Sequence, residues 1–368
     1  MQEDGGAMPL FRGPMGWRRP LGRRQILRLG IAGGAGWLAG GTSRPGAADD
    51  EATRDFRIGT GPTTSNYFII GGIIANAISN PPGSRPCDRG GSCGVPGLVA
   101  VAQTTQGSVQ NVDLVDSAAM DSGLCQSDVA YWAYSGTGMY GNRKPSDGLR
   151  AIANLYQENL HVIVRADSTI NSIADLAGKR VSLGQRGSGT RATAALVLGA
   201  YGLGESKVIG QQLPVATACE RLQDRSIDGL FVVGGPPIPT IADLAQSVEL
   251  RLLPVDRAKA DDLQQKYPFL TVGFIQGGTY ERSPTVVTVG VGTYWLVLAD
   301  LDETLAYGIA TALWHKSTRK QLDEAGALGR RIRLENALVA LPIPLHGGAQ
   351  RYYAEARAQG TLSGPSSN

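Results

Sequence analysis

Apolar residues recur along the chain at two different spacings after position 55. A helix is predicted to begin near Ser65, because four apolar residues follow at intervals of three and four: Tyr67, Ile70, Ile74 and Ile78. Short apolar runs at 56–59 and 98–102 are bounded by glycine, proline or polar residues, which is typical of buried strands. Strands and helices are therefore expected to alternate from the start of the folded chain.

The longest apolar stretch covers residues 151–165 and consists of two apolar runs joined by a polar patch. Two strands would fit this pattern, and so would one long strand that crosses between lobes. Ser172 and Asp175 follow with the spacing of a capping box, which predicts a short helix that Gly178 ends.

Further strand-turn-helix units follow. A strand at 179–183 runs into the glycine-rich turn Gly184-Gln-Arg-Gly-Ser-Gly-Thr190, and an alanine-rich helix is predicted at 191–200. The remaining predicted elements are strands at 227–233 and 285–291 and helices near 215–222 and 303–316. Repeated units of this kind indicate an α/β fold with a parallel or mixed sheet.

The first 48 residues have the features of an export signal. Arginines crowd residues 12–28, a modestly apolar run of about 13 residues follows, and Gly46-Ala-Ala48 supplies the small residues of a cleavage site. That run is too short to span a bilayer. Arg23-Arg24 resembles a twin-arginine signal, and an ordinary secretory signal with an arginine-rich start is the alternative. Both predict a cleaved leader and a periplasmic protein of a Gram-negative bacterium.

Removal of this leader changes the charge balance. The leader holds seven of the 35 lysines and arginines and two of the 32 acidic residues, so the mature chain has 28 basic and 30 acidic residues, a formal net charge of −2. It has no basic stripe and no interleaving of aromatic and basic residues, so we expect no nucleic-acid partner. No later stretch has 18 apolar residues in succession, so we expect no membrane span in the mature chain. We also expect the mature protein to be a monomer.

Four cysteines occur in a chain that is expected in an oxidising compartment: Cys87, Cys93, Cys125 and Cys219. Cys87 and Cys93 flank a flexible loop, which favours a disulfide between them, and pairing of either with Cys125 is the alternative. The three histidines are scattered and no Cys-x-x-Cys pair is present, so neither a metal site nor a cofactor is expected.

Two strand-to-helix turns carry candidate ligand chemistry, at 59–65 and 184–190. In open α/β sheets, ligands bind beyond the carboxyl ends of the strands, where helix N-termini favour anions. Glycine lets the backbone approach closely, and serine and threonine hydroxyls add donors. The alternative is that Ser65 and Thr190 only cap their helices. Arg186 and Arg191 flank the second turn and could pair with a carboxylate.

Motifs for covalent chemistry are not matched. Gly187-Ser-Gly189 lacks the spacing of a nucleophile elbow, and the second turn lacks the ending of a P-loop. No convincing acid-base pair is present. The sequence therefore predicts a binding protein and not an enzyme.

Seven blocks occur in order: Ile58-Gly-Thr-Gly61, Gln106-Gly-Ser-Val-Gln-Asn111, Gln126-Ser-Asp-Val129, Leu176-Ala-Gly-Lys-Arg-Val-Ser-Leu-Gly184, Gly187-Ser-Gly-Thr-Arg191, Ile227-Asp-Gly-Leu-Phe231 and Pro344-Leu-His-Gly-Gly-Ala349. By their order and spacing, the chain from about Phe56 to Glu355 resembles the TAXI-type solute receptors of tripartite ATP-independent periplasmic (TRAP) transporters.

The resemblance implies a type II periplasmic-binding-protein fold, in which two α/β lobes joined by crossing hinge strands close on a ligand. We expect the first lobe at 53–158, the second at 159–271, the return to the first lobe with the C-terminal helices at 272–358, and a disordered tail at 359–368. The resemblance and the second turn together give these ligand-binding candidates: Thr60, Thr63, Ser65, Tyr67, Ser108, Gln126, Gln185, Ser188, Gly189, Thr190 and Arg191.

The implied function is the capture of a small acidic solute, a glutamate-like amino acid or a dicarboxylate, for delivery to TRAP membrane subunits. A sensor subunit for a signalling receptor is one alternative, and an enzyme on the same fold is another. Two stretches, 62–65 and 103–106, carry bulkier side chains than the family pattern and would narrow the site. The loop between Cys87 and Cys93 is expected near the mouth of the cleft.

Overall fold

The computed structural model describes residues 53–362, so the expected leader and the last six residues of the expected tail lie outside the described residues. The strands are β1 (Arg54–Gly59), β2 (Ser79–Asn80), β3 (Val95–Pro96), β4 (Leu98–Gln103), β5 (Ser122–Gln126), β6 (Leu149–Arg165), β7 (Arg180–Ser182), β8 (Ile209–Gln211), β9 (Gly229–Gly234), β10 (Leu250–Leu252), β11 (Leu270–Ile275) and β12 (Val286–Leu298).

The α-helices are α1 (Asn66–Ile78), α2 (Ser108–Asp116), α3 (Ser127–Ser135), α4 (Thr190–Ala200), α5 (Val215–Gln223), α6 (Pro239–Ser247), α7 (Arg257–Lys266), α8 (Glu303–Leu313), α9 (Lys316–Glu324) and α10 (Gly347–Ala358). Short 3-10 helices occur at Cys87–Arg89, Gly138–Tyr140, Ile173–Leu176, Glu205–Lys207, Gly329–Arg331 and Leu334–Asn336. Among the described helices, none has both the length and the apolar character needed to cross a membrane.

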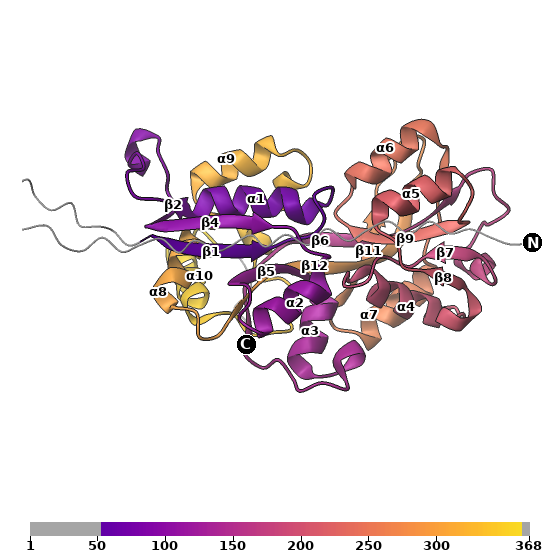
Figure 1. Cartoon of the computed structure of the whole chain (residues 1–368), viewed down its shortest axis with the longest axis horizontal. Helices are drawn as coiled ribbons and strands as arrows, with labels where there is room; N and C mark the ends of the chain where they lie inside the picture. Colours follow the sequence, from indigo (N-terminus) through magenta and orange to yellow (C-terminus); the bar gives the residue numbers. More distant parts are fainter. Residues whose placement is uncertain (1–52, 363–368) are drawn as a thin grey trace, which may run out of the picture. The chain divides into compact units, whose positions relative to one another are not determined.

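Ten strands form one mixed sheet with two parallel parts, β2 and β3 form a separate parallel pair, and the expected α/β class is confirmed. The sheet order is β4-β1-β5-β12-β6-β9-β7-β8, with β10 beside β6 and β11 beside β12. β4, β1 and β5 run parallel in one part, and β9, β7 and β8 run parallel in the other. The long antiparallel pair β6 and β12 joins the two parts, as Figure 1 shows. Of the two alternatives for 151–165, the single long strand is therefore the one found.

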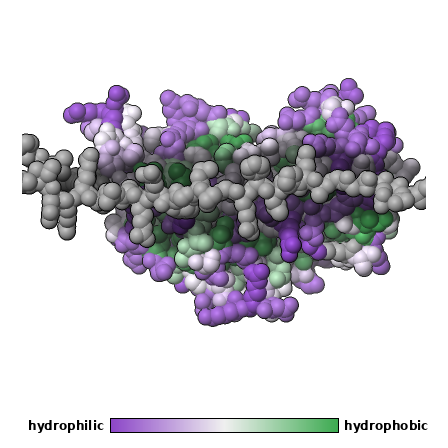
Figure 2. Space-filling view, viewed as in Figure 1, coloured by the Kyte–Doolittle hydropathy of each residue, from purple (hydrophilic) through white to green (hydrophobic). Residues whose placement is uncertain are grey.

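Each part of the sheet is covered by its own helices. α1 packs against β4 and contacts α8 and α9, whereas α4 and α5 pack against β9 and α7 packs against β11 (Figure 1). The apolar core of the described residues has three clusters, and the largest spans both parts of the sheet, from Val129 of α3 to Ala194 of α4. Of the other two, one surrounds the fully buried Trp295 under α1 and α8, and a smaller one surrounds Ile163 under α5 and α6. Hydrophilic side chains gather over α6 and α9 on the face seen in Figure 2.

Several element boundaries differ from the predictions. The helix predicted at 303–316 is two helices, because the His315 ring accepts the Ser317 amide and starts α9 anew. The strand predicted at 285–291 continues to Leu298, where β12 lies between β5 and β6. The tail is not disordered throughout, since Leu362 is buried in the core cluster around Trp295.

The division into lobes remains a proposal, and packing favours a later return than residue 272. Ile275, Tyr280 and Val286 all belong to the cluster around Ile163, together with α5 and α6. We therefore place the return within β12.

The predicted disulfide between Cys87 and Cys93 is confirmed, and Cys125 and Cys219 are free and buried. Its loop does not lie at the mouth of the cleft. It precedes the amino ends of β3 and β4, whereas the cavity described below lies beyond the carboxyl ends of the strands (Figure 1). His315 lies close to both sulfur atoms, which are already joined to each other.

Candidate ligand-binding site

One cavity of about 130 Å³ lies where the two parts of the sheet meet. Six strand-to-helix junctions reach it: β1–α1, β4–α2, β5–α3, β7–α4, β8–α5 and β9–α6. The N-cap residue of each of the six helices lines it: Ser65, Gly107, Gln126, Gly189, Pro214 and Ile238. The positive dipole ends of all six helices therefore converge on one small space.

Local sequence explains two of these helix starts. Ser65 caps α1 because its hydroxyl accepts the Phe68 amide at 3.4 Å. Gly107 begins α2 with a φ of 113°, which favours glycine. Gly189 is needed for a different reason: a Cβ atom there would lie 1.8 Å from Gln126 Oε1, so glycine permits the close approach of α4 to α3.

Hydrogen bonds join the two parts of the sheet around the cavity. The Gly187 carbonyl accepts the Val109 and Gln110 amides of α2 at 3.0 and 3.2 Å. Gln185 Nε2 donates to the Gln106 carbonyl at 2.8 Å beside it. On the other side of the cavity, Asn66 Nδ2 donates to the Gly235 carbonyl at 2.7 Å. These contacts join the two parts of the sheet beside the cavity.

One surface of the cavity, which we call the polar wall, consists of Ser65, Tyr67, Ser108, Gln126 and Glu158. Glu158 is 3% exposed and lies in β6 just before the β6–β9 pairing begins. Tyr67 Oη donates to Glu158 Oε2 at 2.9 Å and lies 3.4 Å from Ser108 Oγ, which accepts the Gln126 amide at 3.1 Å. Burial raises the pKa of Glu158 to about 8, although the Tyr67 hydrogen bond opposes the shift.

The opposite surface, the apolar wall, consists of Pro214, Val215, Val232, Val233 and Ile238. A buried chain of hydrogen bonds holds its edge, because the Ile238 amide donates to Tyr280 Oη at 2.9 Å. Tyr280 Oη lies 3.0 Å from His161 Nε2, and His161 Nδ1 lies 2.9 Å from the Asn159 carbonyl. Burial lowers the pKa of His161 to about 4, so the ring is neutral and its Nδ1–H faces Asn159.

Most of the candidates from the sequence lie together at the cavity. The lining includes Ser65, Tyr67, Ser108, Gln126, Gln185, Ser188, Gly189 and Thr190. Two of these hydroxyls have local partners. Ser188 Oγ donates to the Gln185 carbonyl at 3.0 Å, and Thr190 Oγ1 accepts the Val233 amide at 3.2 Å.

Three candidates lie outside the lining. Thr60 is fully buried behind the turn, where its hydroxyl donates to the Gln103 carbonyl at 2.6 Å. Thr63 is exposed at the tip of the same turn, and its neighbour Thr64 takes the place in the lining. Arg191 is exposed on α4, one residue beyond the cavity-facing Thr190, so the helical turn carries it away from the cavity.

Sequence reasoning missed Glu158 and the whole apolar wall. The polar patch between the two apolar runs of 151–165, which contains Glu158, was the one feature of the sequence that could have indicated a site there. That patch becomes the point where β6 passes from one part of the sheet to the other. The apolar wall gives no local signal, since Val232 and Ile238 have the character of core residues.

The chain was also compared with known proteins, and the NMT1-like family matches residues 58–356. This chain belongs to the NMT1-like family. Solved structures similar to this NMT1-like protein include the Escherichia coli periplasmic aliphatic sulphonate binding protein SsuA. The two sequences are 14% identical, the match covers 82% of this chain and 79% of the SsuA chain, and the TM-score is 0.41. Another is the alkanesulfonate-binding protein SsuA of Xanthomonas axonopodis pv. citri bound to MOPS, with 14% identity, coverages of 85% and 96%, and a TM-score of 0.45.

A third is the ligand-binding component of an ABC-type import system from Staphylococcus aureus with zinc bound, with 10% identity, coverages of 85% and 94%, and a TM-score of 0.45. These likenesses concern the fold alone.

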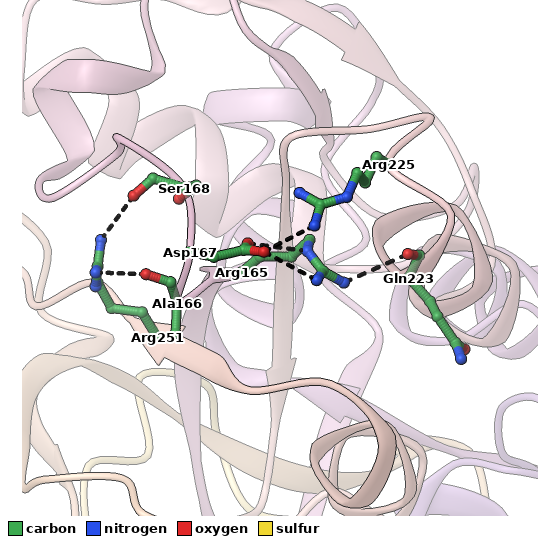
Figure 3. A network of polar contacts seen from close by, with 7 residues as sticks. All are labelled: Arg165, Ala166, Asp167, Ser168, Gln223, Arg225 and Arg251. Atoms are coloured by element: carbon green, nitrogen blue, oxygen red, sulfur yellow. Dashed lines mark hydrogen bonds and ion pairs between the residues drawn. The ribbon is translucent and has the colours of Figure 1, made fainter.

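A second polar cluster of this NMT1-like protein lies outside the cavity (Figure 3). Asp167 accepts hydrogen bonds from Arg165 and, at 2.7 Å, from Arg225. Arg251 donates to the Ala166 and Ser168 carbonyls of the same turn. These contacts fix the turn that follows β6, and they include no residue of either cavity wall.

Proposed function

We propose that this protein is a periplasmic solute receptor that binds a small organic acid in the cavity and delivers it to a membrane transporter. The observation that carries the proposal is the convergence of six helix N-termini on one cavity. Such termini bind anions through unpaired amides and the helix dipole. A carboxylate could therefore be held without a basic side chain, and none of the lining residues of the described chain is lysine, arginine or histidine.

The size of the cavity supports a small ligand. A volume of about 130 Å³ has room for roughly ten water-sized groups, which is the size of a single amino acid or a short dicarboxylate. Both parts of the sheet contribute to the lining, so a bound ligand would contact both and stabilise the closed arrangement. Recognition of that closed form by membrane subunits would complete the delivery.

The lining chemistry favours binding over catalysis. Of the described lining residues, Glu158 and Tyr67 alone are titratable, and a Tyr67 hydrogen bond already engages Glu158. An acid-base mechanism needs a second group poised for proton transfer. We therefore propose a receptor without covalent chemistry.

The resemblance in sequence favours TRAP membrane subunits as the partner, whereas the Staphylococcus aureus protein described above belongs to an ABC-type import system. The two can be separated genetically in the source organism. If the partner is a TRAP transporter, deletion of its large membrane subunit abolishes uptake of the ligand. Uptake that survives this deletion and is lost when an ABC permease is deleted would overturn the choice of partner.

The function is tested by native mass spectrometry of the mature chain purified from periplasm, followed by denaturing release of any bound compound. A small carboxylate at one per chain is the expected result. A protein that is empty and that no member of a panel of amino acids, oxo acids and dicarboxylates stabilises against heat would contradict the proposal.

A further inference from the structure

A series of three hydrogen bonds in the polar wall, from Gln126 through Ser108 and Tyr67 to Glu158, runs in one direction. The Gln126 amide donates to Ser108 Oγ, and Tyr67 Oη donates to Glu158 Oε2. Since the Tyr67 proton is directed at the carboxylate, the contact between Ser108 and Tyr67 has Ser108 as its donor. The Gln126 amide and the Ser108 and Tyr67 hydroxyls thus all donate within this series. When Glu158 is ionised, the series offers a ligand acceptor lone pairs at its Glu158 end.

No described residue supplies a cation to Glu158. The groups that face its carboxylate are Tyr67 from α1, Cys125 from β5, Asp128 from α3, Thr293 from β12 and Tyr156 from its own strand, which are all neutral or acidic. No salt bridge among residues 53–362 includes it. A buried carboxylate of this kind is costly unless a positive partner enters.

The cavity is thus asymmetric. The helix N-termini supply donors and positive potential around it, whereas the Glu158 end supplies acceptors and a potential negative charge. A dicarboxylate would place an anion against Glu158. A ligand with a carboxylate and a protonated amine would satisfy both ends at once.

We propose that Glu158 binds the protonated amine of the ligand, so that the solute is an amino acid and not a dicarboxylate or an oxo acid. This inference rests on the proposed function. Glu158 would set the specificity, and Tyr67 and Ser108 would position its carboxylate. Removal of one partner from a buried ion pair of this kind lowers the affinity roughly 10- to 100-fold.

The test uses matched ligands that differ only at one carbon, where an ammonium is replaced by a ketone. The pairs are L-glutamate with 2-oxoglutarate and L-leucine with 4-methyl-2-oxopentanoate, each titrated calorimetrically into the mature chain. We expect one of the amino acids to bind at least about tenfold more tightly than its oxo acid. Glu158→Gln should reduce that preference to within about twofold by weakening the amino acid.

Two further variants separate recognition from folding. Asp167→Asn changes an acid outside the lining and should keep the preference of the wild type. Tyr67→Phe removes the donor to Glu158 Oε2, so it should shift the pH profile of amino-acid binding upward while the fold is kept. A purely structural role for Glu158 would move neither the preference nor that profile.

The outcomes distinguish this inference from the proposed function. If 2-oxoglutarate or a released amine-free acid binds as tightly as an amino acid, the assignment of Glu158 is wrong and the receptor function stands. The assignment also falls if Glu158→Gln keeps the wild-type preference. If no bound compound is released and no panel compound binds, the proposed function and this inference both fail.

Discussion

The polar wall and the apolar wall border the same cavity but recognise a ligand in different ways. The polar wall is built from helix starts and one strand residue, and its hydrogen bonds have fixed directions. The apolar wall is built from Val232, Ile238 and their neighbours, whose contacts have no direction. The polar wall can therefore select the class of polar groups on a ligand, and the apolar wall can select only the size of the remainder.

The two walls also differ in what supports them. Tyr67 of the polar wall packs in the cluster around Trp295. Val232 and Ile238 of the apolar wall belong to the smaller cluster around Ile163. Changes in Val232 or Ile238 therefore disturb folding and binding together. Changes in Glu158 should act mainly on binding. The predictions below test this contrast, from the largest expected effect to the smallest.

The largest effect is expected at Gly189, where α4 closely approaches Gln126 of the polar wall. In Gly189→Ala the new Cβ would overlap Gln126 Oε1 at 1.8 Å and crowd Gln126 Cδ at 2.5 Å. Gln126 is 4% exposed and has little room to move. We expect the affinity for the native ligand to fall about 10- to 100-fold, measured by calorimetry, because overpacking costs about 1–3 kcal/mol in the closed form.

The matched control for this prediction lies on the same helix. A Cβ at Gly199 would have no atom within 4 Å, so Gly199→Ala should leave affinity unchanged and stabilise α4 slightly. Equal affinities for the two variants would show that closure does not need glycine at position 189.

The apolar wall is tested by adding one hydroxyl group to it. Val232→Thr keeps the shape of a β-branched strand residue but places an oxygen at a site that is 4% exposed. The free energy of unfolding in urea should fall by about 1–3 kcal/mol, because no partner awaits the hydroxyl. Val101→Thr, at an exposed position of β4, should change it by less than about 0.5 kcal/mol. Equal losses in the two variants would contradict the burial argument.

The polar wall is tested by its response to pH. Burial raises the folded-state pKa of Glu158 to about 8, above its unfolded value, so the ligand-free protein loses stability as the pH rises toward and through 8. The thermal midpoint of the wild type, relative to Glu158→Gln at each pH, should decline between pH 5 and pH 9.

Amino-acid binding should show the opposite trend. Between pH 7 and pH 8 the ionised fraction of Glu158 rises from about a tenth to about a half, so the affinity should rise about fivefold. A pH-independent difference between the two proteins would show that Glu158 keeps one charge state throughout.

The sequence predicted those features that depend on local order. Ser65 could be placed as a helix cap because the apolar spacing after it and the hydroxyl capping preference agree. The two glycine-rich turns could be recognised for the same reason. The repeated strand-to-helix order also predicted that the two turns lie at one cavity, because ligands of open α/β sheets bind beyond the carboxyl ends of the strands.

Other features depend on contacts across the chain. Whether Thr60 or Thr64 faces the cavity is decided by the turn that holds Thr60 against Gln103, and no spacing reveals it. The break before α9 depends on a single ring, that of His315. Glu158 looks like an ordinary polar residue in the sequence, and only its burial among neutral and acidic neighbours distinguishes it.

The smallest effect is expected at Asp167, which has more charged partners than any residue of the polar wall but faces no ligand (Figure 3). Hydrogen bonds from Arg165 and Arg225 lower its pKa to about 2, so its stabilising contribution is present above the unfolded pKa and is lost as the pH falls through about 2. Because these side chains are well exposed, solvent and salt weaken the contribution. Asp167→Asn should therefore lower stability slightly at neutral pH, less so in high salt, and leave ligand affinity within twofold of the wild type. A larger change in affinity would mean that this cluster is coupled to the cavity, and the contrast between the two walls would no longer account for recognition.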